Sequence, residues 1–117
     1  MGAPVVHFEI GCRDAGKTAA FYEKLLGWKT EAYGPAQMIN TGSSTGIAGH
    51  INSLGHPPHN YVTVYAQVDD LAATIKKAES LGAKQMVPPT EVPGMGHFAW
   101  ITDPEGTIFG LWKTMAQ

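Results

Sequence analysis

An imidazole and a carboxylate, His7 and Glu9, stand two residues apart in the segment Val5 to Ile10. This segment is short, rich in β-branched and aromatic residues and roughly alternating, which predicts a β-strand. Successive side chains of a strand point to opposite faces, so His7 and Glu9 share one polar face. Side chains of these two types can transfer protons or contribute ligands to a metal ion.

The other reactive side chains stand in less informative surroundings. The single cysteine, Cys12, has no partner for an intramolecular disulfide, which fits a protein of the reducing cytoplasm. His56 and His59 stand in a proline-rich turn, where we expect solvated loop histidines. His97 follows Gly94-Met95-Gly96, where a ligand could come near the backbone, although turn geometry also explains the glycines. We expect neither a nucleotide-phosphate loop nor a serine or cysteine nucleophile.

The strand of His7 and Glu9 is followed by the signals of one helix and three further strands. Asp14 is a suitable helix N-cap, and Gly27 provides a left-handed stop. The apolar residues at helical spacing between them are Phe21, Tyr22 and Leu25. Glycine, proline and serine residues then separate predicted strands near 28–33, 37–40 and 46–52.

The same order of elements begins again after a turn region at 53–60. A strand is predicted at 61–68, Asp69 or Asp70 caps a helix, and Gly82 follows as its stop. The helix carries on one face Leu71, Ile75 and Ala78. Strands are predicted near 85–87, 97–102 and 107–113, and Asp103-Pro104-Glu105-Gly106 between the last two is typical of a type I turn.

The two halves correspond at an offset of 55 residues, which aligns Asp14 with Asp69, Leu26 with Leu81 and Gly27 with Gly82. The sequence therefore predicts a single α+β domain over 1–117 with two βαβββ modules, at about 4–53 and about 60–114. Each module alone would expose the apolar face of a curved sheet, so we expect the two to pair, within the chain or between chains.

The composition limits the classes of partner that we expect. With 44% hydrophobic and 15% charged residues, 117 residues suffice for one core. Eight basic against ten acidic residues give a net charge of −2, so we expect no nucleic acid and no membrane surface as partner. The sequence has no run of about 18 apolar residues and no signal-peptide pattern at its start, so we expect a cytoplasmic protein.

Two stretches resemble the vicinal oxygen chelate superfamily, which includes glyoxalase I, bleomycin-resistance proteins and dioxygenases. Ala20-Phe21-Tyr22-Glu23-Lys24-Leu25-Leu26-Gly27-Trp28 is similar to its first helix, and 102–111 to its closing turn and strand. The segment 87–98 is similar to one glyoxalase-like branch. The resemblance implies two βαβββ modules forming an open curved β-barrel around a pocket, frequent homodimers, and often a divalent metal held by one residue from each of four strands.

That resemblance places the four metal-ligand positions at His7, His50, Thr63 and Gly110. Threonine and glycine stand where metal-using relatives carry histidine and glutamate. A catalytic metal usually needs at least three protein ligands, so the centre is incomplete and we expect no cofactor, although a divalent metal stays an alternative. Glu9 could complete a two-histidine, one-carboxylate set with His7 and His50, of the type that suits non-haem iron.

Strand alternation from these positions predicts a mixed aromatic and polar pocket for a small organic molecule. Its ligand-binding residues are His7, Glu9, His50, Asn52, Thr63, Tyr65, Gln67, His97 and Trp112. At Gly110 we expect vacant space in place of a glutamate. The leading hypothesis is a metal-independent small-molecule-binding protein of the glyoxalase/bleomycin-resistance type that forms a homodimer.

Three alternatives stay open. One is a metal-dependent lyase or dioxygenase that uses His7, His50 and Glu9. Another is a metal-free catalyst in which Glu9 is a base with a raised pKa. The last is a structural or regulatory module without catalysis.

Overall fold

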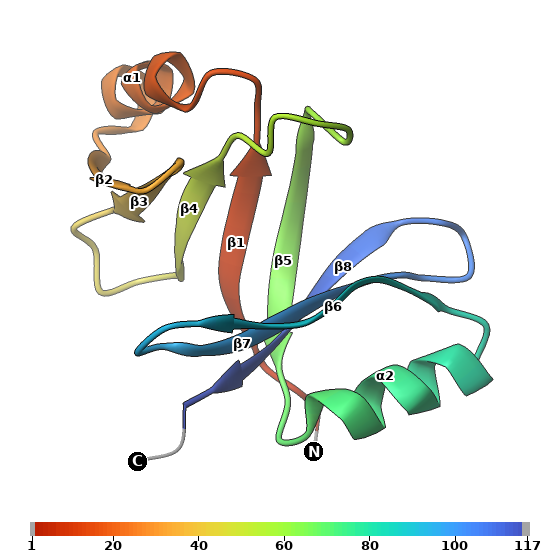
Figure 1. The fold of residues 1–117 in the computed structure, drawn as a ribbon. Helices are drawn as coiled ribbons and strands as arrows, with labels where there is room; N and C mark the ends of the chain where they lie inside the picture. Colours follow the sequence, from red (N-terminus) through yellow and green to blue (C-terminus); the bar gives the residue numbers. More distant parts are fainter. Residues whose placement is uncertain (1, 116–117) are drawn as a thin grey trace. The chain divides into compact units, whose positions relative to one another are not determined.

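The computed structural model describes residues 2–115, which form eight β-strands and two α-helices (Figure 1). In chain order these are β1 (Val5–Gly11), α1 (Ala15–Leu26), β2 (Lys29–Tyr33), β3 (Ala36–Asn40), β4 (Ala48–Asn52), β5 (Tyr61–Gln67), α2 (Leu71–Ser80), β6 (Lys84–Val92), β7 (Gly96–Thr102) and β8 (Ile108–Thr114). The order βαβββ occurs twice, so the predicted α+β fold is confirmed.

The chain forms two compact units. The N-terminal unit is His7–Thr63, and the C-terminal unit combines the residues up to Val6 with those from Val64 onward. Each unit contains a helix and most of four strands.

In the N-terminal unit the strand order is β2-β3-β4-β1. The β2/β3 and β3/β4 pairs are antiparallel and β1/β4 is parallel, with Glu9 opposite His50. Helix α1 packs against β2, β3 and β4 (Figure 1). The core between them contains Ile10, Cys12, Ala19, Ile39 and Ile51. Because His7 and Glu9 alternate with Phe8 and Ile10 along β1, they point to the sheet face away from this core.

Helix α1 begins and ends where the sequence predicts. The Asp14 side chain accepts a hydrogen bond from the Lys17 N–H, and Gly27 ends the helix at φ 73°. Of the apolar residues at helical spacing, Tyr22 packs against the core and the other two do not. Ala19 is buried, while Phe21 and Leu25 are 56% and 60% exposed. The small side chain of Ala19 lets the helix approach the sheet, and the larger Phe21 and Leu25 point outward.

In the C-terminal unit the strand order is β5-β8-β7-β6, with β5/β8 parallel and the other pairs antiparallel. Asp70, one of the two predicted caps, accepts from the Ala73 N–H at the start of α2. Leu71 and Ile75 are buried, as expected, against Ala99 and Leu111 of the sheet. The predicted turn is confirmed, since the Gly106 N–H donates to the Asp103 carbonyl at 2.8 Å.

Strand β6 is three times longer than the predicted 85–87. It continues through Pro88 and Pro89 to Val92, with register shifts between Gln85 and Val87 and between Val87 and Thr90. Proline cannot donate a ladder hydrogen bond and is tolerated at an edge strand or a bulge. The predicted strand stopped before these prolines. Because β6 is the outermost strand of its sheet and carries bulges, the real strand continues through them.

Neither α1 nor α2, the two helices within residues 2–115, has the length and hydrophobicity needed to cross a membrane.

Candidate functional site: a chain of four hydrogen-bonded side chains

Four polar side chains of the N-terminal unit form one continuous hydrogen-bonded chain. The His7 Nε2 and His50 Nδ1 atoms are 2.7 Å apart. On the other side of the same ring, His50 Nε2 lies 3.1 Å from Glu9 Oε1. The Tyr61 hydroxyl donates to Glu9 Oε2. The order of the chain is therefore His7, His50, Glu9, Tyr61.

Strand register and one glycine place these side chains. The parallel β1/β4 pair sets Glu9 opposite His50, so the two side chains share a face and meet. The Tyr61 ring lies directly on the backbone of Gly11, where an added Cβ would come within 1.9 Å of the ring. Only glycine leaves room for this approach, which lets the Tyr61 hydroxyl reach Glu9.

Burial determines the electrostatics of the chain. Glu9 is only 2% exposed, and each of its carboxyl oxygens has a polar partner, as a buried polar group requires: the Tyr61 hydroxyl donates to Oε2, and His50 Nε2 lies beside Oε1. Burial is the main cause that lowers the pKa of His7 to about 4; nearby His50 lowers it further and Glu9 partly opposes both. Burial and the bond to Glu9 raise the pKa of the Tyr61 hydroxyl above its ordinary value, so it stays a donor.

The lowered pKa of His7 predicts a loss of stability in acid. Between pH 6.5 and about 4, the unfolded chain binds a proton at His7 more readily than the folded protein does. The free energy of unfolding should therefore fall as the pH decreases through this window, by at most about 3 kcal/mol from His7, and His7 should add no slope above it. Urea unfolding of wild type and His7→Gln at several pH values measures this contribution.

His56→Gln is the matched control, because His56 is exposed and its Nδ1 atom lies 2.8 Å from the neighbouring Pro57 carbonyl oxygen. We expect it to keep the wild-type slope, whereas His7→Gln flattens the slope between pH 4 and 6.5. Equal slopes in wild type and His7→Gln would contradict the assignment of this effect to His7.

The donor set does not fit the metal centre that the resemblance implies. Within residues 2–115 no group of three or more His, Cys, Asp or Glu side chains is arranged to hold a metal ion. His7, His50 and Glu9 do lie together, but as a line: His50 uses one ring nitrogen toward His7 and the opposite one toward Glu9. One ion cannot bind to both nitrogens of the same ring, so the three side chains do not converge on a single point.

Two further predicted residues lie in this unit. Asn52 is half-buried opposite Gly11, and its carbonyl accepts from the Cys12 N–H. Thr63 is 5% exposed on β5, two residues after Tyr61. Both lie on the strands that carry the chain of four side chains.

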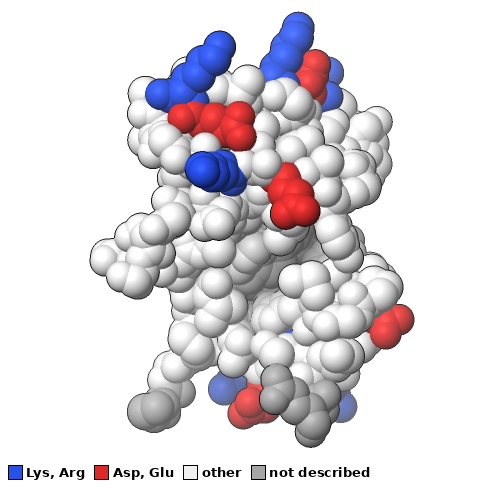
Figure 2. All heavy atoms as spheres, turned by 90° about the vertical axis from the view of Figure 1, so that its left-hand side faces the viewer, with Lys and Arg blue, Asp and Glu red and all other residues white. Residues whose placement is uncertain are grey.

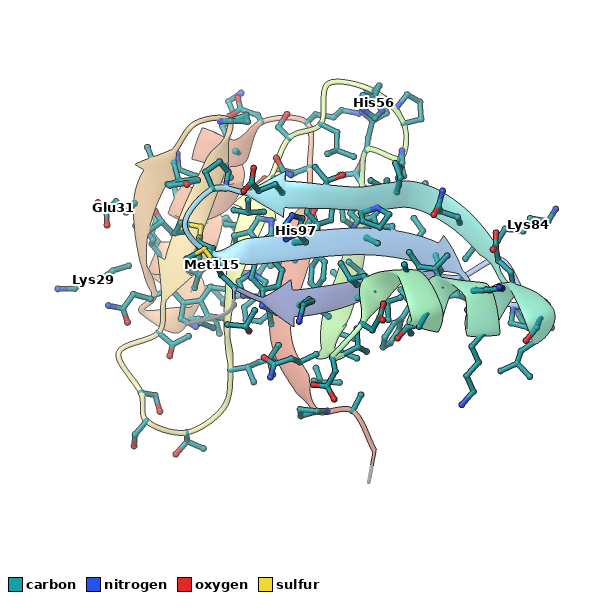
Figure 3. The ribbon with its side chains drawn as sticks, turned by 60° about the horizontal axis from the view of Figure 1, so that its bottom comes forward. Lys29, Glu31, His56, Lys84, His97 and Met115 are labelled. Carbon is teal, nitrogen blue, oxygen red and sulfur yellow. The ribbon has the colours of Figure 1, made fainter. Side chains whose placement is uncertain are left out.

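The other predicted site residues belong to the C-terminal unit. The Tyr65 hydroxyl accepts from the Trp100 indole N–H at 2.7 Å, and both residues are buried. Gln67 Oε1 accepts from the Thr114 hydroxyl, which in turn accepts from the Trp112 indole N–H. His97 is exposed on β7 (Figure 3). Cross-strand pairing places Tyr65 and Trp100 opposite Gly110, and Gln67 and Phe98 opposite Trp112.

The vacant space expected at Gly110 is not there. A Cβ at this position would lie 2.4 Å from Cδ2 of the Tyr65 ring, which fills the space. A glutamate therefore cannot be added as a metal ligand without moving Tyr65, and the expectation was wrong because it considered the strand face without its neighbour's side chain.

One motif went unnoticed in the sequence. Residues 11–18 match the spacing G-x-x-x-x-G-K-T of phosphate-binding loops, and they do connect a strand to a helix. The Asp14 carboxylate, however, accepts from the Lys17 N–H, and the Asp14 carbonyl accepts from the Thr18 N–H. The Cys12 N–H donates to Asn52. The Asp14 carboxylate thus lies at the start of α1, where a phosphate would bind in such a loop.

The hollow beside this loop has a volume of about 340 Å³, and none of the four hydrogen-bonded side chains lines it. Its lining residues are Ile10, Gly11, Cys12, Lys17, Thr18, Phe21, Tyr22 and Asn60.

Tyr61 is the site residue that sequence reasoning missed. The signal was available, because Tyr61 is two residues before Thr63 and so shares its strand face. The predicted set began at Thr63 because that position was aligned with a metal ligand.

Comparisons with known proteins agree with this architecture. The profile described as "Glyoxalase/Bleomycin resistance protein/Dioxygenase superfamily" matches residues 5–111. The anthracycline biosynthesis protein DnrV of Streptomyces peucetius is 32% identical over 96% of this chain and 47% of its own length. A glyoxylase-like domain-containing protein of Didymella fabae is 30% identical over 88% of both chains. The chain spans about half the length or less of several curated relatives it matches.

Solved structures show the same fold at low sequence identity. Methylmalonyl-CoA epimerase from Mycobacterium tuberculosis has a TM-score of 0.69 and 13% identity, covering 96% of this chain and 88% of the epimerase.

Proposed function

Because this chain belongs to the glyoxalase/bleomycin resistance protein/dioxygenase superfamily, we propose that it binds a small organic molecule without the superfamily's metal centre. The observation that carries the proposal is the bonding of His7, His50 and Glu9 to one another. Atoms of these three residues that could bind a metal are instead bonded to one another. Thr63 and Gly110 supply neither an imidazole nor a carboxylate.

The C-terminal unit supports binding of an organic ligand. Its sheet face opposite α2 carries four aromatic rings, of which Phe98 and Trp112 are half-buried, while Tyr65 and Trp100 are buried beneath them as support. Aromatic rings supply large contact area, and a few polar groups such as Gln67 can orient a ligand. Basic and acidic side chains lie close together in the upper part of the face in Figure 2, which supports the expectation that nucleic acid is not a partner.

Metal titration tests the proposal. We expect Mn²⁺ and Zn²⁺ to give negligible heat when titrated into wild type and into His50→Asn, because binding would require breaking the bonds from His50 to His7 and to Glu9. Stoichiometric uptake by wild type that His50→Asn abolishes would contradict the proposal and favour the metal-dependent lyase or dioxygenase.

Ligand binding can be followed by the fluorescence of the three tryptophans. Bleomycin and an anthracycline are the first probes, since the family description and a curated relative carry these names. We expect saturable quenching by at least one of them, unchanged by EDTA. Quenching that EDTA abolishes would contradict metal independence, and the failure of both probes would favour a structural or regulatory module.

We also propose that the protein is a homodimer and resides in the cytoplasm. Phe21, Leu25 and Leu26 leave an apolar surface on α1, each more than half exposed, which supports association with a second copy. The unpaired Cys12 supports a reducing compartment.

A further inference from the structure

We infer that the hollow beside residues 11–18 is a ligand site of its own, which binds a small aromatic molecule carrying one carboxylate. The hollow lies in the N-terminal unit, since its lining residues all fall between Ile10 and Asn60. Its volume of about 340 Å³ is within the range of small-molecule sites. The inference goes beyond the proposed function, because none of these residues belongs to the aromatic face of the C-terminal unit or to the hydrogen-bonded chain of side chains.

Several polar groups that line the hollow make no side-chain hydrogen bond or ion pair within residues 2–115. They are the Lys17 ammonium, the Thr18 and Tyr22 hydroxyls and the Asn60 amide. Lys17 and Asn60 are exposed. Among the described residues that are not exposed, every buried side-chain nitrogen or oxygen has a partner, so the two hydroxyls are open to solvent as well. These groups can therefore bind a ligand without breaking a bond inside the protein.

A row of aromatic rings ends at the hollow. The Tyr22 ring stacks on the Trp28 ring at a centroid distance of 5.5 Å, and Trp28 in turn lies 5.6 Å from the Phe8 ring. At the other end of the row, the Phe21 ring meets Tyr22 edge-on at 4.9 Å. Phe21 and Tyr22 both line the hollow, and Phe21 is 56% exposed. A ligand ring placed against Phe21 would extend the row and cover apolar surface that now faces water.

The charge of the lining favours an anion. Lys17 is the only charged residue among those described as lining the hollow. Its ammonium can donate a charge-assisted hydrogen bond to a carboxylate, and the Asn60 amide can add a neutral one. The Asp14 carboxylate, at the start of α1, would repel a phosphate or another dianion more strongly than it repels a single negative charge. A monocarboxylate therefore fits better than a phosphate.

The helix sets the distance between the cation and the ring. Lys17 and Phe21 are four residues apart on α1, so they lie on the same side of the helix about one turn, or about 5.4 Å, apart along its axis. A carboxylate attached directly to an aromatic ring spans a similar distance. The spacing thus favours an aryl carboxylate over an acid whose charge lies at the end of a long chain.

The probe is 2-naphthoate, and calorimetry on the full chain measures its Kd. We expect Lys17→Met to weaken binding about 5-fold or more, because the carboxylate loses a charged donor at an exposed position. Lys17→Arg should keep most of the affinity, since arginine also donates to a carboxylate. The neutral analogue 2-naphthalenemethanol should bind wild type and Lys17→Met alike. Equal binding of 2-naphthoate by wild type and Lys17→Met would overturn the role of Lys17.

Phe21→Ala tests the ring contact and should weaken 2-naphthoate about 5-fold or more. Leu25→Ala is the matched control, because Leu25 is 60% exposed on the same helix and does not line the hollow. Leu25 also belongs to the apolar surface that we assign to a second copy. An equal loss of affinity in both variants would therefore trace the effect to association between copies and overturn the ring contact.

Nitrogen-15 NMR of the backbone amides locates the bound probe. We expect 2-naphthoate to shift the amides of Cys12, Lys17 and Asn60. Shifts at Gln67 and Trp112 instead, with an unchanged Kd in Lys17→Met, would overturn the inference and leave the proposed binding function of the C-terminal unit. The absence of saturable binding at millimolar 2-naphthoate would overturn the inference for its ligand class, whereas quenching by bleomycin or an anthracycline would still support the proposed function.

Discussion

Replacing Gly11 by alanine should lower the free energy of unfolding by about 3 kcal/mol, at the upper end of the cost of overpacking a close-packed site. The added Cβ would lie 1.9 Å from Cε2 of the Tyr61 ring, so the ring must move. Once moved, its hydroxyl can no longer reach Glu9, and a carboxylate that is 2% exposed loses one of its donors. Urea denaturation measures the total effect.

A double-mutant cycle isolates the collision. In a Tyr61→Ala background the obstacle is gone, so Gly11→Ala should cost less than about 1 kcal/mol there. An equal cost in both backgrounds would show that the alanine acts through the strand backbone instead of through the ring. Gly2→Ala is a control in open space, since nothing lies within 4 Å of an added Cβ there.

Replacing Gly110 by glutamate should be at least as damaging, with a loss of about 3 kcal/mol or more, because it adds both bulk and an ionisable group. The Cβ alone would lie 2.4 Å from the Tyr65 ring, which is buried and bonded to the Trp100 indole. We expect a lower Tm and no gain of metal binding, since Tyr65 occupies the space that the carboxylate would need.

Introducing Gly110→Ala into wild type and into Tyr65→Ala separates the effect of bulk from that of charge. Gly110→Ala should lower the free energy of unfolding markedly when Tyr65 is present and hardly at all in the Tyr65→Ala background. A well-folded Gly110→Glu protein that takes up Zn²⁺ stoichiometrically would restore the vacant pocket expected from the sequence and contradict the packing described for the C-terminal unit.

The parts of the fold that follow local rules were predictable from sequence. Asp14 caps the start of α1 and Gly27 ends it, because capping depends on a few neighbouring atoms. The turn at Asp103 forms for the same reason. Alternation along β1 placed His7 and Glu9 on one face. What failed depended on neighbours across the sheet: β6 continues through its prolines because its position is at an edge.

The candidate site shows the same division. The side chains of His7, Glu9 and His50 meet, and their grouping was expected from strand alternation and the resemblance. They form a line that continues to Tyr61. This arrangement depends on atomic positions being right to within a few tenths of an ångström and on the absence of a Cβ at Gly11. No periodicity carries that information.

The prolines of β6 also bear on how molecules of this protein meet in a concentrated cell. An outermost strand invites another chain to add to it, which is the first step toward amyloid-like aggregation. Pro88 and Pro89 offer no N–H to an incoming strand, and the nearby bulges break the regular spacing that it would need. The outer strand of the N-terminal unit is β2. Its Lys29 and Glu31 side chains point away from the sheet (Figure 3) and would place charges against an incoming strand. Each unit thus carries on its outermost strand its own protection against open-ended polymerisation.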